Sequence, residues 1–214
     1  MQYTSIFIAG FRATGKTTIG KLLAEKLGWD FIDMDEKIEL KAGMPVNQIT
    51  QSGTEWQTFR QLEHDVLKEL ITKEKIVVSM GGGTAVNDIV KEGSATTFGR
   101  LNQEILRSQK QALIVLLTAS DEIIAERMRR HEMRKDITKR PILSEKRAQE
   151  TQKHLKNAEH DLSQQKEILI NEIVSDALET YNKRKPLYAA LTKHVVDTGE
   201  MSAQDAVTYI MQRV

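Results

Sequence analysis

The segment that most constrains this chain is GFRATGKT at residues 10–17, which matches the phosphate-binding pattern GxxxxGK[ST]. It follows a short apolar run at residues 5–9 and precedes a helix-like stretch, Thr18 to Leu27, which ends at Gly28. In this strand–loop–helix context, backbone N–H groups of the loop and of the helix N-terminus face phosphate oxygens. The motif therefore predicts a site for a nucleoside triphosphate, whereas a glycine-containing turn without a ligand is the plainer alternative.

The residue types within the motif divide the work of binding. Lys16 is expected to reach the β- and γ-phosphates, and the Thr17 hydroxyl is expected to bind Mg²⁺. The nucleotide is expected to contact Ala13, Thr14, Gly15, Lys16, Thr17 and Thr18.

Composition excludes several classes of protein. The 214 residues favour one domain, or a domain with an insertion, and 31 Lys and Arg balance 30 Asp and Glu. This balance argues against nucleic-acid or anionic-membrane partners. Cysteine is absent, which excludes disulfides, thiolate metal sites and cysteine nucleophiles. The first apolar run is too short for a signal peptide and no run could span a membrane, so we expect a soluble, cytoplasmic protein.

Short apolar runs recur along the chain and alternate with helix-like segments. This alternation is typical of an α/β fold, a parallel sheet covered by helices on both faces, with ligands at the carboxyl ends of the strands. The expected strands are residues 5–9, 29–32, 76–79, 113–117 and 195–196.

The stretch from Ser144 to Tyr181 differs from the rest, because it is rich in Glu, Lys, Gln and Asn and lacks Pro and Gly. Its apolar residues recur at helical spacing, which predicts one long helix or two helices that meet near Ser163. A solvated helix with one packed face is the simplest interpretation. The spacing of His154 and His160 does not suit two metal ligands one turn apart.

Asp33 and Asp35 follow the second expected strand. In an extended segment, alternation puts both carboxylates on one side of the chain. One carboxylate could help to hold Mg²⁺ through water, and the other could orient an attacking hydroxyl or accept its proton. Alternatively, the two residues are a helix cap and a turn residue.

Three further features offer groups for a phosphorylated or acidic ligand. In a helix, Arg60 and Glu63 lie on one face, so Glu63 could fix a guanidinium that reads a carboxylate, although an ordinary surface pair is also possible. Gly81, Gly82 and Gly83 end the third strand, where the backbone could approach a ligand or form a tight loop. Arg140 directly precedes Pro141, which predicts a loop there, and Arg184 lies just before an expected turn that contains Pro186.

Taken together, these motifs resemble the shikimate kinases, small members of the nucleoside-monophosphate-kinase-like group. The resemblance covers nearly the whole chain except residues 144–182. It is carried by GFRATGKT at 10–17, DMD at 33–35, FRQLE at 59–63, GGG at 81–83, RPIL at 140–143 and RKPLY at 184–188.

The resemblance implies a single P-loop kinase domain over residues 1–214, with a five-stranded parallel sheet and a long helical insertion. It implies a substrate-binding region at about 33–63 and a lid with insertion at about 129–182. The implied reaction is the phosphorylation of the 3-hydroxyl of shikimate by ATP with Mg²⁺, in the biosynthesis of aromatic amino acids. Residue roles implied for this chain are catalysis by Asp35, Lys16 and Arg140, metal binding by Thr17 and Asp33, a lid position over ATP for Arg140, and shikimate binding by Asp35, Arg60, Gly81, Gly82, Gly83 and Arg184.

Two departures from the family pattern stand out. The stretch between Arg140 and Arg184 is much longer than the family normally has, and the stretch from Gly83 to Leu113 is somewhat extended. By resemblance we expect a monomer, although a dimer through the insertion remains open. Two other functions remain open: a related kinase for another hydroxy acid such as gluconate, and a non-catalytic nucleotide-binding interaction module.

Overall fold

The computed structural model describes residues 3–50, 55–133 and 162–214. Contacts divide the chain into two compact units, one formed by Met1–Ala119 with Arg184–Val214 and the other by Ser120–Lys183. Each unit is described by itself below.

The first unit is built on a five-stranded parallel sheet in the order β2-β3-β1-β4-β5. The five predicted strands are confirmed, each within one residue of its expected ends. Their bounds are Ser5–Gly10 for β1, Asp30–Asp33 for β2, Ile76–Ser79 for β3, Ala112–Thr118 for β4 and Val195–Asp197 for β5. Because β1 lies at the centre between β3 and β4, the loops that follow these three parallel strands meet at the carboxyl ends of the strands.

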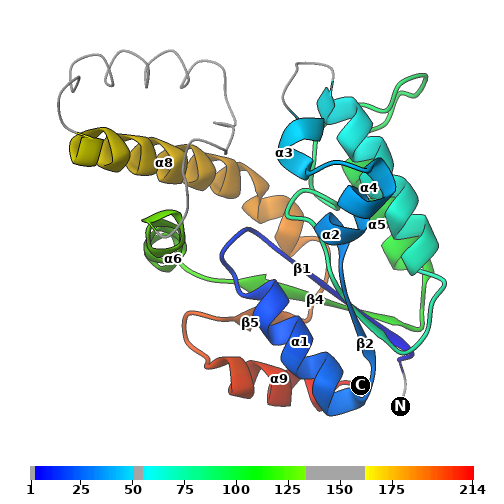
Figure 1. Cartoon of the computed structure of the whole chain (residues 1–214). Helices are drawn as coiled ribbons and strands as arrows, with labels where there is room; N and C mark the ends of the chain where they lie inside the picture. The colour runs from blue at the N-terminus through cyan, green and yellow to red at the C-terminus, as the bar shows by residue number, and fades with distance from the viewer. Residues whose placement is uncertain (1–2, 51–54, 134–161) are drawn as a thin grey trace. The chain divides into compact units, whose positions relative to one another are not determined.

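Helices cover both faces of this sheet (Figure 1). On one face α1 packs against α9, and α4 packs against both α2 and α5 on the other. Their bounds are Lys16–Leu27 for α1, Met34–Ala42 for α2, Val46–Ile49 for α3, Glu55–Leu70 for α4, Phe98–Ser108 for α5 and Ala203–Met211 for α9.

The core of the first unit follows from the alternation of side chains along the strands. Ile6 and Ile8 of β1 are fully buried in the cluster that α1 and α9 complete. Phe7, between them, is equally buried. A strand that is apolar on both faces requires cover on both sides, which explains the two helical layers.

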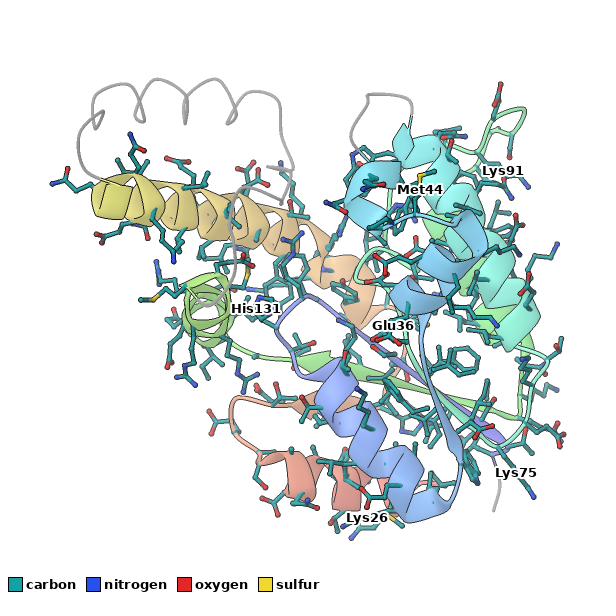
Figure 2. The ribbon with its side chains drawn as sticks, in the orientation of Figure 1. Lys26, Glu36, Met44, Lys75, Lys91 and His131 are labelled. Atoms are coloured by element: carbon teal, nitrogen blue, oxygen red, sulfur yellow. The ribbon has the colours of Figure 1, made fainter. Side chains whose placement is uncertain are left out.

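The starts of β1, β2, β3 and β4 are aligned at the end of the sheet opposite the phosphate-binding motif. Lys75, labelled in Figure 2, has a φ of 54°, and its backbone bonds the residue just before β1 and the first residue of β2. Its N–H donates to the Thr4 carbonyl at 2.7 Å, and its carbonyl accepts from the Asp30 N–H at 2.9 Å. These two bonds set the entry of β3 between β1 and β2.

The second unit contains α6 (Asp121–Met133) and most of α8 (Leu162–Ala189). Side-chain hydrogen bonds join the two helices, among them Arg129 to Asn171 at 3.5 Å, Lys166 to the Met133 carbonyl at 3.1 Å, and Asn182 to Asp121 at 3.1 Å. The apolar stripe of α8 is buried at Ile170, Ile173, Val174, Ala177 and Tyr181. The prediction of helix is therefore confirmed from Leu162 onward, while residues 144–161, on which the choice between one helix and two depends, lie outside the described residues.

The turn predicted at Pro186 is wrong. Pro186 lies inside α8, which continues to Ala189. A proline in a helix removes one N–H donor. Here it lies in the last turn, and its carbonyl still accepts from the Ala190 N–H at 3.2 Å. Across the described residues, no helix combines the length and the apolar character that crossing a membrane requires.

Candidate functional site

The loop after β1 forms an anion-binding cradle. Gly15 is the N-cap of α1 with a φ of 92°, and no side chain caps the helix. The first turn of α1 also carries no acidic residue, so its backbone N–H groups and the helix dipole remain available to an anion. Within the loop, the Thr14 hydroxyl donates to the Phe11 carbonyl at 2.8 Å, and Lys16 Nζ donates to the same oxygen at 2.9 Å. The predicted strand–loop–helix arrangement is confirmed, because this loop connects β1 directly to α1.

Ala13 lies at the tip of this loop in a left-handed conformation, with a φ of 64°. For a residue with a Cβ, this conformation costs about 1–2 kcal/mol. Such strain is common where a backbone is shaped to bind a ligand.

Asp33 has two roles at the end of β2. Its Oδ1 accepts from the Asp35 N–H at 3.1 Å, so it caps α2, and its Oδ2 accepts from the Thr17 hydroxyl at 3.1 Å. The expectation that Asp33 and Asp35 lie on one extended segment is wrong, because Asp35 is in the first turn of α2. The cap interpretation was correct for Asp33, and the cap itself brings Asp33 to Thr17 of the phosphate-binding loop.

Electrostatics distinguish Asp35 and Lys16 from other charged residues of the site. The pKa of Asp35 is raised to about 6. Burial is the largest cause, and the nearby carboxylates of Glu63 and Asp33 also raise it. Solvent still reaches Asp35, and water screens part of these interactions. Burial lowers the pKa of Lys16 to about 8, against the opposing effect of Asp35 and Asp33. Both groups thus have a pKa moved toward neutrality.

Arg60 and Glu63 form a buried pair on α4, with Nη1 and Oε2 2.6 Å apart. Their side chains are only 6% and 0% exposed, so the alternative of an ordinary surface pair is wrong. The guanidinium also lies over the rings of Trp56 and Phe59, at 5.2 and 5.0 Å from the ring centroids. Its Nε is buried and has no hydrogen-bond partner among the described residues. An unpartnered buried donor of this kind is available to a ligand.

The glycine loop, residues 81–83, follows β3 and fits closely against these side chains. A Cβ on Gly83 would lie 2.6–2.8 Å from the Arg60 guanidinium, and one on Gly81 would lie 2.4 Å from Glu63 Oε1. The glycines thus make room for Arg60 and Glu63 themselves, in addition to any ligand that the backbone approaches. From α8, the Tyr188 hydroxyl donates to the Gly82 carbonyl.

Arg184 lies on α8, one helical turn before Tyr188. Burial lowers the pKa of Arg184, and the positive charge of Arg60 lowers it further, while Tyr188, Glu63 and Asp88 have the opposite effect. The guanidinium groups of Arg60 and Arg184 repel each other, and Arg60 Nε is a buried donor without a partner among the described residues. Together these features indicate a place for an anion. Arg140 lies outside the described residues.

Sequence reasoning missed several residues around this site. Thr84 donates its hydroxyl to Glu63 Oε1 at 2.5 Å, and its position directly after three glycines was a usable signal. The spacing of Tyr188, four residues after Arg184 on one helix face, was another. The buried His64 and Asn102, whose side chains are 2.7 Å apart, are separated by 38 residues and offered no signal.

Comparisons with known proteins agree with this geometry. A family model described as shikimate kinase matches residues 12–177. A shikimate kinase of Thermodesulfovibrio yellowstonii is 34% identical over 151 residues, which are 71% of this chain and 75% of that protein.

Solved structures show similar folds. A shikimate kinase from Acinetobacter baumannii in complex with shikimate has a TM-score of 0.65 and 25% identity, covering 99% of this chain and 92% of that one. A gluconokinase from Sinorhizobium meliloti has a TM-score of 0.51 and 16% identity, covering 98% and 90%, and shows the fold alone. Because the family model spans most of the sequence and the relative exceeds 30% identity over more than two thirds of it, the chain belongs to the shikimate kinase family of ATP-dependent kinases.

Proposed function

We propose that this chain transfers the γ-phosphoryl group of ATP to the 3-hydroxyl of shikimate. The observation that carries the proposal is the buried Arg60, whose charge acts on both Asp35 and Arg184. A carboxylate and a hydroxyl on one small molecule match these groups, and shikimate carries both.

The arginines are proposed to bind the carboxylate of the acceptor. Arg60 is held by Glu63 through one nitrogen, while its buried Nε lacks a partner among the residues that the structure describes. A carboxylate would satisfy that donor and would also relieve the repulsion between Arg60 and Arg184. Backbone groups of Gly81, Gly82 and Gly83 are proposed to complete this subsite.

Asp35 is proposed to orient the reacting hydroxyl and to accept its proton. Its pKa of about 6 keeps it ionised at neutral pH yet makes it a better base than an ordinary carboxylate. Phosphoryl transfer depends chiefly on positioning and on neutralising the charge of the phosphates. Lys16 supplies such a charge within the phosphate-binding loop, and Arg140 is proposed to supply another from a lid.

The nucleotide is proposed to lie along residues 13–18, with its phosphates on the N-terminus of α1. Thr17 is the proposed protein ligand for Mg²⁺, and Asp33 is proposed to contribute to the metal site through water, because their oxygens lie 3.1 Å apart. Within the described residues, no cluster of three or more His, Asp or Glu could bind a metal ion by itself. That fits Mg²⁺, which keeps several waters and binds few protein oxygens. When bound, Mg²⁺ neutralises charge on the phosphate oxygens.

Other parts of the sequence interpretation stay proposals. These are the single kinase domain over residues 1–214, with a substrate-binding region at about 33–63 and a lid with insertion at about 129–182, the monomeric state and the cytoplasmic location.

Gluconate also carries a carboxylate and hydroxyls, so the arginine pair alone does not separate it from shikimate. A non-catalytic module is disfavoured because Lys16, Asp35 and Arg140 are all present, and nucleotide binding alone does not need all three.

Calorimetric titration tests the carboxylate subsite directly. Shikimate should bind the purified protein, and its methyl ester, which lacks the charge, should bind at least tenfold more weakly, since hydrogen bonds to charged groups contribute about 1.5–3 kcal/mol. Equal affinities for the acid and the ester would refute the assignment of Arg60 and Arg184.

A further inference from the structure

We infer that His64 and Asn102 are positioning residues that hold the glycine loop against Arg60 and thereby set the affinity for the carboxylate substrate. The inference rests on the proposed function. Neither residue belongs to the nucleotide or metal site, and both are buried, at 7% and 0% exposure.

Side-chain amides hold the carbonyls of three consecutive residues at this loop. Asn87 Nδ2 donates to the Gly83 carbonyl at 3.0 Å, from within the same loop. The other two amides come from α5, where Asn102 Nδ2 donates to the Thr84 carbonyl at 2.7 Å and Gln103 Nε2 donates to the Ala85 carbonyl at 2.7 Å. The backbone after β3 is therefore anchored to α5 through side chains.

His64 completes the hydrogen bonding of the central amide. Its Nδ1 lies 2.7 Å from Asn102 Oδ1. Because Asn102 uses its NH₂ group to bond Thr84, its Oδ1 must accept, and so His64 Nδ1 must carry a hydrogen. Without that donor, the buried Asn102 Oδ1 would lose the partner that the structure gives it, which weakens the hold of Asn102 on the Thr84 carbonyl. The histidine thus supports the asparagine that anchors the loop.

The anchored backbone reaches the proposed carboxylate subsite by two routes. The Thr84 hydroxyl donates to Glu63 Oε1, while Glu63 Oε2 accepts from Arg60. In addition, Gly83 lies so close to the guanidinium that no Cβ would fit between them. A displaced loop would therefore move both the carboxylate that holds Arg60 and the surface on which Arg60 rests.

The position of His64 on α4 suits this role. It follows Glu63, and successive helix residues point about 100° apart, so one helix directs Glu63 to the loop and His64 to α5. The ring also contacts Phe98 of α5, with centroids 6.0 Å apart. A buried histidine needs a hydrogen-bond partner in any case, but the partner here is the amide that anchors the loop.

Three variants separate the hydrogen bond from packing. His64→Phe keeps a ring against Phe98 and removes the Nδ1 donor. His64→Asn places an amide nitrogen near the former Nδ1 and should restore the bond. Gln61→Met is the matched control, because it removes a side-chain hydrogen bond of the same helix, to Asp65 at 3.0 Å, which does not reach the loop.

Two measurements are made on each variant: steady-state KM values for shikimate and ATP with kcat, and hydrogen exchange of the amides of residues 83–86 in the ligand-free protein. In His64→Phe we expect the shikimate KM to rise about fivefold to tenfold, the cost of one buried hydrogen bond. The ATP KM and kcat should stay near wild type, and the loop amides should exchange faster. His64→Asn and Gln61→Met should resemble wild type in every value.

The proposal is overturned if His64→Phe leaves the shikimate KM and loop exchange unchanged, if it raises the ATP KM equally, or if His64→Asn is as impaired as His64→Phe. Failure of the proposed function is recognised separately, because wild type itself would then not phosphorylate shikimate. In that event the same comparison, made with whichever hydroxy acid wild type does phosphorylate, decides the role of His64.

Discussion

Replacing Gly83 by alanine should damage the acceptor site while leaving the nucleotide site intact. The added Cβ would lie 2.6 Å from Arg60 Nη2 and 2.7 Å from Nη1, well inside an ordinary contact. The guanidinium cannot retreat freely, because it is bonded to Glu63 and lies against the rings of Trp56 and Phe59. Overpacking of this kind costs about 1–3 kcal/mol.

The cost should divide between stability and substrate binding. If Arg60 loses its alignment with the carboxylate, the shikimate KM should rise about tenfold or more, since about 1.4 kcal/mol corresponds to a factor of ten. Coupled assays of ADP release give the KM for each substrate, and denaturant unfolding gives the free energy of unfolding. Gly82→Ala is the control for unfolding alone, because its Cβ would meet no heavy atom closer than 3.7 Å. A Gly83→Ala protein with a wild-type shikimate KM would refute the reasoning.

Three further predictions concern the acceptor site and its support. Asp35→Asn should nearly abolish turnover with little change in ATP affinity. The folded-state pKa of Asp35, about 6, exceeds its ordinary value of 3.8, so ionisation of Asp35 destabilises the fold as the pH rises through this range. The variant should therefore be more stable than wild type above pH 6 but not near pH 4. Measuring the free energy of unfolding at both pH values checks the sign. Arg60→Lys and Arg184→Lys should each weaken shikimate binding by about 1.5–3 kcal/mol despite the retained charge, because an ammonium lacks the planar fork, and an unchanged KM in both would place the carboxylate elsewhere. Gly99→Ala would set a Cβ 2.3 Å from the Asn87 carbonyl oxygen, so α5 must shift. We expect a lower free energy of unfolding and a higher shikimate KM. A stable variant with unchanged KM would count against the anchoring of the glycine loop by α5.

The sheet and the phosphate-binding loop were predictable because their signals are local. Buried parallel strands appear as short apolar runs, and β1 and β3 are buried at every residue. The loop motif is contiguous, and its geometry depends on residues within it, such as the contact of Thr14 and Lys16 with the Phe11 carbonyl. The i,i+3 spacing of Arg60 and Glu63 also sufficed to predict their pair, although only the fold shows that it is buried.

Errors arose where a residue had two uses or where a rule has exceptions. Asp33 caps a helix and contacts Thr17, and the alternation argument ignored the helix that begins one residue later. Proline ends many helices, but Pro186 lies in the last turn of α8, where the remaining backbone hydrogen bonds persist. The contact of His64 with Asn102 depends on how α4 packs against α5, and no local pattern of the sequence contains that information.

The most direct test of the account is ADP release by the purified protein with ATP and Mg²⁺ against a panel of acceptors. The panel contains shikimate, its methyl ester, gluconate and a nucleoside monophosphate. The account predicts strong stimulation by shikimate, little by the other three, and loss of the shikimate response in Asp35→Asn. Turnover of gluconate or a nucleoside monophosphate without turnover of shikimate would contradict it.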